Sequence, residues 1–467
     1  MESPELHYRQ LTDVAIDIKA HRLSPVEVTQ AILARIEKLE PELQSYTTVT
    51  ADLALEQARE AEAEIMQGRY RSPLHGIPIA VKDLCYTKGI PTSAGMAINR
   101  NWVPDYDATV VKRLRDSGAI ILGKLHMTEG ATLEHHPEMP PPRNPWNSDL
   151  WTGVSSSGSG VATAAGLCYA SLGSDTGGSI RFPSACNALT GVKPTWGRVS
   201  RYGVFDLGAS YDTVGPMTRS AADSATVLRA IAGYDENDPT SLSDPVPDYL
   251  GDLQGVYGAR ALTIGVDWGF NSEDADPAMI AQIEAAAAIF AELGAELRDV
   301  EFPDPGLVLD PSMNLIGVEL AVAHEGSYPG QAERYGPAIA KMIESGRNAD
   351  PVQLGRAMIE RDKFRGRMAR LFTKVDAVII PVFMRGSPTW SEVADLVEND
   401  MRALMKFTSP INASRNPTVT LPCGFTPDGN PVAFQLVGAH CSEGVLLRAA
   451  HAYQQMTDWH TRRPPLA

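Results

Sequence analysis

The order of apolar and polar residues predicts two helices near the start of the chain. Four apolar side chains recur there at helical spacing: Val28, Ile32, Ile36 and Leu39. This spacing predicts a helix over residues 23–39, and Ser24 and Glu27 have the types and separation of a capping box at its start. Residues 51–66 consist largely of strong helix formers and predict a second helix. We interpret this opening as structural.

Further along, short apolar runs that are typical of buried strands alternate with helical patterns. The predicted strands cover residues 77–81, 119–125, 261–267, 295–302, 377–382, 419–422 and 432–437. A helical pattern over residues 276–293 lies between two of these strands and forms a βαβ unit with them. Alternation of this kind predicts an α/β fold with a largely buried sheet.

The composition is that of a globular protein, and it restricts the partners and the compartment that we expect for the protein. Of 467 residues, 43% are hydrophobic, and 41 basic against 57 acidic residues give a net charge of −16. This excess of negative charge disfavours binding to nucleic acid or to an anionic membrane. The N-terminus lacks the regions of a secretory signal, and the longest clean apolar run, residues 377–384, is too short to span a membrane. Five scattered cysteines without a CxxC pair indicate free thiols, so we expect a cytoplasmic protein.

Residues 153–183 contain the most distinctive pattern in the chain. Two clusters rich in glycine and serine flank a run of small apolar residues. The pattern predicts two loops joined by a tightly packed helix and strand, because a flexible linker would stay polar throughout. Residues 175–179 could supply a serine nucleophile together with backbone N–H groups that form an oxyanion hole. From residue chemistry alone, a plain glycine-rich turn is an equally good interpretation.

A lysine stands at the end of the strand predicted over residues 77–81. The charge of a buried lysine is costly unless it is paired or neutralised. Taken alone, the segment is therefore best interpreted as Lys82 reaching solvent or pairing with Asp83.

Two other motifs are poor matches to binding sites. Residues 118–125 nearly match a phosphate-binding P-loop, but they lack the serine or threonine after the lysine. His135 and His136 are adjacent in a proline-rich stretch, residues 126–151, without a third metal ligand at a suitable spacing. We therefore predict no metal and no cofactor, and we interpret residues 126–151 as a wall of the active-site mouth.

The sequence resembles the amidase signature family over essentially its whole length. Three segments carry the resemblance: Gly-Ile-Pro-x-x-x-Lys-Asp at residues 76–83, the Gly/Ser-rich loop at 153–160, and Gly-Gly-Ser-Ile-Arg-x-Pro at 177–183. The resemblance implies a three-layer α/β/α sandwich around a large mixed β-sheet, in a single domain of residues 1–467. Within this domain it implies N-terminal helices over residues 1–70, a signature core over 71–235, and an α/β part with pocket-lining segments over 236–467.

The resemblance also implies a catalytic triad of serine, cis-serine and lysine. Ser179 matches the nucleophile, Ser155 matches the bridging serine on a cis peptide bond, and Lys82 matches the base. Under this interpretation Lys82 is desolvated, so that its neutral form is accessible, and it does not reach solvent.

Six further positions have roles in the family pattern, and others depart from it. Thr176, Gly177 and Gly178 match oxyanion donors. Ser156 is expected to support the first loop through hydrogen bonds, and Asp175 and Arg181 are expected to hold the second loop as an ion pair. The chain departs from the family near the expected pocket mouth at Gly130, Val154, Ser157, Arg415 and residues 140–142.

Together these features imply a hydrolase that cleaves the C–N bond of an amide, an anilide or a carbamate. An aryl acylamidase or a urethanase is the preferred substrate class. The alternative is an A-type subunit of a glutaminyl- or aspartyl-tRNA amidotransferase, which releases ammonia to a partner. A catalytically silent binding protein is disfavoured because all three triad residues are present. The expected partner is a small-molecule substrate, with no nucleic acid and no membrane, and the expected state is a monomer or a homodimer.

Overall fold

One mixed β-sheet organises the protein, whose computed structural model describes residues 3–253 and 258–466. Its strands are β1 Tyr46–Val49, β2 Pro78–Lys82, β3 Ile120–Leu125, β4 Ala170–Asp175, β5 Thr190–Lys193, β6 Thr213–Thr218, β7 Thr263–Val266, β8 Glu296–Asp299, β9 Ala377–Pro381, β10 Thr418–Phe425 and β11 Pro431–Gly438. The 11-stranded sheet has the order β1-β3-β2-β4-β6-β5-β10-β11-β9-β7-β8. β2 is parallel to β3 and β4, β7 is parallel to β8 and β9, and the other neighbours are antiparallel. The large mixed sheet is therefore confirmed.

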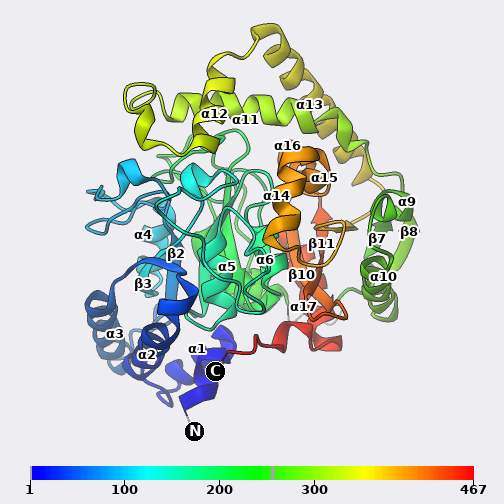
Figure 1. The fold of residues 1–467 in the computed structure, drawn as a ribbon. Coiled ribbons are helices and arrows are strands. Elements are labelled where there is room, and N and C mark those ends of the chain that lie inside the picture. The colour runs from blue at the N-terminus through cyan, green and yellow to red at the C-terminus, as the bar shows by residue number, and fades with distance from the viewer. Residues whose placement is uncertain (1–2, 254–257, 467) are drawn as a thin grey trace.

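Helices surround this sheet (Figure 1). The α-helices are α1 Leu11–Lys19, α2 Pro25–Leu43, α3 Ala51–Met66, α4 Thr109–Asp116, α5 Ser157–Ala164, α6 Arg181–Cys186, α7 Ala221–Ile231, α8 Tyr249–Asp252, α9 Trp268–Ser272, α10 Pro277–Glu292, α11 Leu309–Ala323, α12 Pro337–Arg347, α13 Pro351–Leu371, α14 Trp390–Asn399, α15 Met401–Met405, α16 Ser409–Ser414 and α17 Glu443–Met456. Short 3₁₀ turns cover Ser3–Tyr8, Ala97–Asn99, Glu129–Ala131, Pro305–Leu307, Ala332–Arg334 and Trp459–Thr461. Figure 1 shows α11, α12 and α13 together at one end of the molecule.

The central strand β6 shows how the helices form layers on both faces of the sheet. Met217 packs with Ala164 of α5 and with Ile180, directly before α6. The next residue, Thr218, has its hydroxyl 2.7 Å from that of Ser224 in α7. Because successive side chains of a strand point to opposite faces, α5 and α6 cover one face and α7 covers the other.

The strongest sequence patterns match the structure closely. The helix predicted over residues 51–66 is α3, with the same bounds. α2 begins after Ser24, whose side chain forms the predicted capping box with Glu27. β7, α10 and β8 form the predicted βαβ unit with parallel strands. The P-loop-like segment contains β3, a fully buried strand.

Several elements were not predicted, among them two strands and a helical segment. β1 has only four residues, two of which are threonines, and β6 contains Gly215 and Pro216 in its interior. Neither strand contains an apolar run long enough to mark it. α14, α15 and α16 are short helices within residues 390–414, and their apolar residues do not form one continuous helical pattern.

The sheet brings the two predicted catalytic segments to one edge. β2 and β4 are parallel neighbours, with Val81 paired to Leu172. Their carboxyl ends therefore lie side by side, and these ends carry Lys82 and Asp175. Residues 153–183 form two loops joined by α5 and β4, as predicted.

One segment of the described chain is long and apolar enough to cross a membrane, judged by length and composition alone. It covers Pro305–Ala323 and includes α11. Its residues Leu315, Ile316 and Leu320 are buried against the rest of the protein. A single segment of this kind does not by itself identify a membrane protein.

We predict that Ser24→Ala lowers the free energy of unfolding by about 1 kcal/mol, because its side chain accepts hydrogen bonds from the N–H groups of Val26 and Glu27 at the start of α2. Urea denaturation would measure the change. Gln10→Ala is the matched control, since Gln10 caps α1 without a side-chain hydrogen bond. An equal loss of stability in both variants would contradict the prediction.

Candidate active site

Lys82 lies at the buried end of β2, in contact with two serines. Its Nζ is 2.6 Å from Ser155 Oγ and 2.8 Å from Ser174 Oγ. The side chain is fully buried, and this desolvation lowers the pKa of Lys82 to about 7. A substantial fraction of Lys82 is therefore uncharged near neutral pH, and its amine can accept a proton.

Neither of the simple interpretations of Lys82 is correct. The side chain does not reach solvent, and Asp83 is paired with a different lysine. Lys124 Nζ, on the neighbouring strand β3, lies 3.3 Å from Asp83 Oδ1. Asp83 Oδ2 also accepts hydrogen bonds from the N–H and hydroxyl groups of Ser93. The charge of Asp83 is thus balanced on the other side of β2.

The first serine loop is fixed by close packing. A Cβ on Gly153 would lie 2.4 Å from Pro183 Cα, and Gly153 has a positive φ of 73°. Any larger residue would push the loop away from α6. One residue further along the chain, the peptide bond between Val154 and Ser155 is cis. The Val154 side chain is buried with Trp151 and Phe182, so its branched side chain fits the loop.

Ser156 links the first loop to the end of β4. Its hydroxyl donates to the carbonyl oxygen of Ser174 and accepts from the Ser174 N–H, both at 3.2 Å. The expected supporting role of Ser156 therefore connects the two loops, and it does not act within one of them. Both Ser155 and Ser174 are held beside Lys82 by this connection.

A buried ion pair holds the second loop. Arg181 Nη2 lies 2.8 Å from Asp175 Oδ1, and Arg181 Nε lies 3.0 Å from Asp175 Oδ2. Burial by itself would raise the pKa of Asp175, but the charge and hydrogen bonds of Arg181 outweigh it and hold that pKa well below its usual range. The loop between the two residues contains Ser179.

Distant segments complete this ion pair. Asn412 Nδ2 donates to Asp175 Oδ1 at 2.8 Å, and the Asn412 side-chain oxygen accepts from Arg181. Arg181 also donates to the Thr408 carbonyl oxygen and to Gln435. The ion pair expected between Asp175 and Arg181 is present, and it joins the second loop to α16 and β11.

The expected oxyanion donors differ in their availability. The Gly178 N–H, one of the expected oxyanion donors, donates to Asp175 Oδ1 at 2.9 Å in this structure. The Thr176 hydroxyl donates to Asp212. The N–H groups of Thr176, Gly177 and Ser179 have no acceptor among the described residues. These three groups remain able to donate to a carbonyl oxygen.

Half-buried Ser179 lies at the wall of a cavity of about 50 Å³. Leu207, Ile316 and Met405 contribute apolar walls. Thr132, Leu133, Met313 and Met342 line this cavity and also an outer cavity of about 630 Å³. Thr132 and Leu133 belong to residues 126–151, so part of that stretch lines the cavity beside Ser179.

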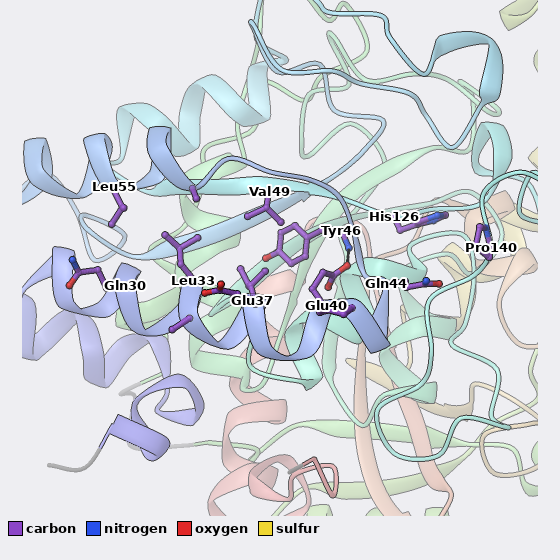
Figure 2. A pocket seen from close by; sticks show the side chains of 14 residues that line it. Gln30, Leu33, Glu37, Glu40, Gln44, Tyr46, Val49, Leu55, His126 and Pro140 are labelled. Atoms are coloured by element: carbon purple, nitrogen blue, oxygen red, sulfur yellow. Dashed lines mark hydrogen bonds between the residues drawn. The ribbon is translucent and has the colours of Figure 1, made fainter.

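A larger groove of about 950 Å³ lies elsewhere, between α2, β1 and α3. Figure 2 shows Leu33 and Glu37 of α2 facing Tyr46 and Val49, with His126 at the far end. None of the triad candidates lines this groove. Its size therefore does not make it the catalytic site.

Two departures from the family pattern have structural explanations. Gly130 has a φ of 55°, and a Cβ there would lie 2.6 Å from Ile339 Cδ1 in α12. A side chain at position 130 would therefore require the end of the Ile339 side chain to shift. Arg415 adopts a φ of 67°, a conformation that favours glycine, and its guanidinium lies 3.7 Å from the centre of the Trp196 ring.

Sequence reasoning missed Ser174, Asn412 and the methionines of the cavity. Ser174 precedes Asp175 at the end of β4, and its position beside the predicted oxyanion loop was the one available signal. Asn412 and Met405 are distant in sequence from both serine loops, and only the fold brings them there.

The residues that the structure describes contain no group of three side chains suited to hold a metal ion. His135, one of the two adjacent histidines, has Nε2 3.0 Å from Ser157 Oγ. Burial holds the pKa of His135 well below its usual range. Its neutral ring packs behind the first serine loop.

Known proteins resemble the chain over nearly its whole length. A Mycobacterium tuberculosis protein named "Putative amidase AmiD" is 46% identical, with 98% of this chain and 96% of that protein covered. The A-type subunit of the glutamyl-tRNA(Gln) amidotransferase of Chloroflexus aggregans is 37% identical, with 99% of each covered. The solved structure of peptide amidase from Stenotrophomonas maltophilia has a TM-score of 0.83 and 30% identity, with 100% of this chain and 99% of that chain covered. The model of the family described as Amidase matches residues 27–447, and the chain therefore belongs to the amidase family.

Proposed function

We propose that the chain hydrolyses amide-type C–N bonds through an acyl-enzyme on Ser179, with Lys82 as the base and Ser155 as the proton relay. The contact that supports this proposal most strongly is the 2.6 Å separation between Lys82 Nζ and Ser155 Oγ. A fully buried lysine with a pKa near 7 is suited to general-base catalysis at neutral pH. Amide hydrolysis is also the activity expected of a member of the amidase family.

In the proposed reaction, neutral Lys82 takes a proton from Ser155 as Ser155 takes one from Ser179. Ser179 Oγ then forms a bond to the carbonyl carbon of the substrate. The proton returns through Ser155 to the nitrogen, the C–N bond breaks, and the amine leaves. Water next gives a proton to the same relay and attacks the ester carbon, which releases the acid and restores Ser179.

The N–H groups of Gly177 and Ser179 are the proposed donors to the oxyanion. Neither has another acceptor within the described part of the chain. Donors aimed at the developing negative charge contribute a large share of the rate in acyl transfer. The Asp175–Arg181 ion pair holds these donors in place, because the two residues flank the loop that carries them.

The proposal also covers the substrate class, the cellular compartment and the oligomeric state. We take an aryl amide or a carbamate as the preferred substrate class, with no cofactor or metal. Cys85, Cys168, Cys186 and Cys423 are buried free thiols, which supports a reducing, cytoplasmic setting. The functional unit is a monomer or a homodimer.

We predict that Ser179→Ala abolishes hydrolysis of every amide that the wild-type protein cleaves, because no other group forms the acyl-enzyme. Release of p-nitroaniline from simple anilides would measure the activity. Circular dichroism would show the unchanged fold, since the Ser179 side chain makes no hydrogen bond within the described part of the chain. Turnover comparable to that of the wild-type protein would overturn the mechanism.

We predict that kcat/KM for an uncharged amide rises with pH through about 7 and then levels off, because Lys82 accepts a proton only when it is neutral. Below this value the rate should fall about tenfold per pH unit. Ser174→Ala should move this limb to lower pH, since Ser174 accepts a hydrogen bond from Nζ that favours the charged form, and the variant lacks it.

A matched control for this pH profile is Ser171→Ala. Ser171 is on the same strand and bonds to Thr163 and Ser159, not to Lys82. In Ser171→Ala, kcat/KM should rise with pH over the same range as in the wild-type protein. A profile independent of pH between about 5 and 9 in the wild-type protein would exclude Lys82 as the base.

The 37% identity to an A-type amidotransferase subunit supports a second candidate function. In that case the chain would release ammonia from glutamine for a partner protein. We predict that the isolated chain leaves glutamine intact, as measured by an ammonia assay, while it hydrolyses simple anilides. Ammonia release from glutamine that depends on Ser179 would favour the amidotransferase function.

A further inference from the structure

We infer that the acyl group of the substrate is short, apolar and uncharged, and that the larger part of the substrate is its amine. This inference rests on the proposed function and narrows its substrate. The inner cavity beside Ser179 has a volume of about 50 Å³. The neighbouring outer cavity has about 630 Å³, so the inner cavity takes the smaller part of the substrate. A short acyl group fits this space.

The inner cavity has no charged wall. None of its lining residues, all in the described part of the chain, is acidic or basic. Leu207, Ile316, Phe182 and three methionines supply most of its surface. A charged acyl group would lose its hydration in this cavity without gaining a counter-ion.

The charged groups behind the cavity wall are already engaged. Arg181 donates to Asp175, to Asn412 and to the Thr408 carbonyl oxygen. Asp212 accepts hydrogen bonds from the Thr176 hydroxyl and from the N–H groups of Leu207 and Gly208. Neither is available to bind the carboxylate or the ammonium of an amino acid.

The order of product release indicates which cavity holds the acyl group of the substrate and which holds its amine. The amine must leave while the acyl group is still bonded to Ser179. The inner cavity adjoins the outer cavity at Thr132, Leu133, Met313 and Met342, which line both. The amine therefore occupies this outward side, and the acyl group remains in the inner cavity. The outer cavity, at about 630 Å³, is large enough for an aromatic amine.

Met405 lines the inner cavity and limits the length of the acyl group that the cavity can hold. Its Cε would lie 3.7 Å from a Cβ placed on Gly177, so its thioether covers the loop that carries the oxyanion donors. Met342 stands at the junction of the two cavities. Methionine side chains adapt to irregular spaces, and their removal should lengthen the cavity.

The test uses one leaving group and a series of acyl groups: acetyl, propionyl, butyryl, hexanoyl and succinyl p-nitroanilides. We expect kcat/KM to be highest for propionyl or butyryl and to fall at least tenfold for hexanoyl. Succinyl is close to butyryl in length but ends in a carboxylate, and its kcat/KM should be at least a hundredfold lower. Met405→Ala, or Met342→Ala if the first variant is unstable, should raise the hexanoyl-to-butyryl ratio at least tenfold.

Met358→Ala is the matched control, because Met358 is exposed on α13 and lines neither cavity. It should leave the ratio unchanged. Hydrolysis of succinyl anilide at the butyryl rate, or equal rates for all chain lengths, would overturn the inference if the activity disappears in Ser179→Ala. Absence of any hydrolysis dependent on Ser179 would instead overturn the proposed function, and the inference with it.

Discussion

The buried ion pair between Asp175 and Arg181 holds the candidate active site together. Asp175 ends β4 and Arg181 begins α6, so the pair closes the short loop that carries Ser179. Asn412 of α16 and Gln435 of β11 also bond to this pair. A buried charge that loses its partner is strongly destabilising. The geometry of the loop that carries Ser179 therefore depends on segments that are distant from it in sequence.

Two buried lysines on neighbouring strands show how their surroundings decide their chemistry. Lys124 on β3 lies close to a carboxylate and to the Thr92 hydroxyl, so its charge is balanced. Lys82 on β2 contacts the hydroxyls of Ser155 and Ser174. Since no acid of the described chain forms an ion pair with its amine, burial favours the neutral form. The pairing of Asp83 with Lys124 therefore leaves Lys82 suited to accept a proton.

The sequence predicted well what depends on neighbouring residues. The capping box at Ser24, the helix α3 and the two serine loops around α5 and β4 follow from local patterns. The family motifs pointed to Lys82, Ser155 and Ser179 as triad candidates. The involvement of the Gly178 N–H with Asp175 could not be predicted, because it depends on how the loop curls around that carboxylate. The contact of Lys82 with Ser174 likewise requires the register between β2 and β4.

The residues of the cavity come from two separate parts of the chain. The groups that would carry out the chemistry lie between residues 82 and 181, whereas Met313, Ile316, Met342 and Met405 come from α11, α12 and α15. Substitutions in these later helices can reshape the cavity without disturbing the ion pair or the lysine. Evolution, or a protein engineer, could therefore exchange the substrate by varying these cavity positions while Lys82, the ion pair and its partners Asn412 and Gln435 are kept.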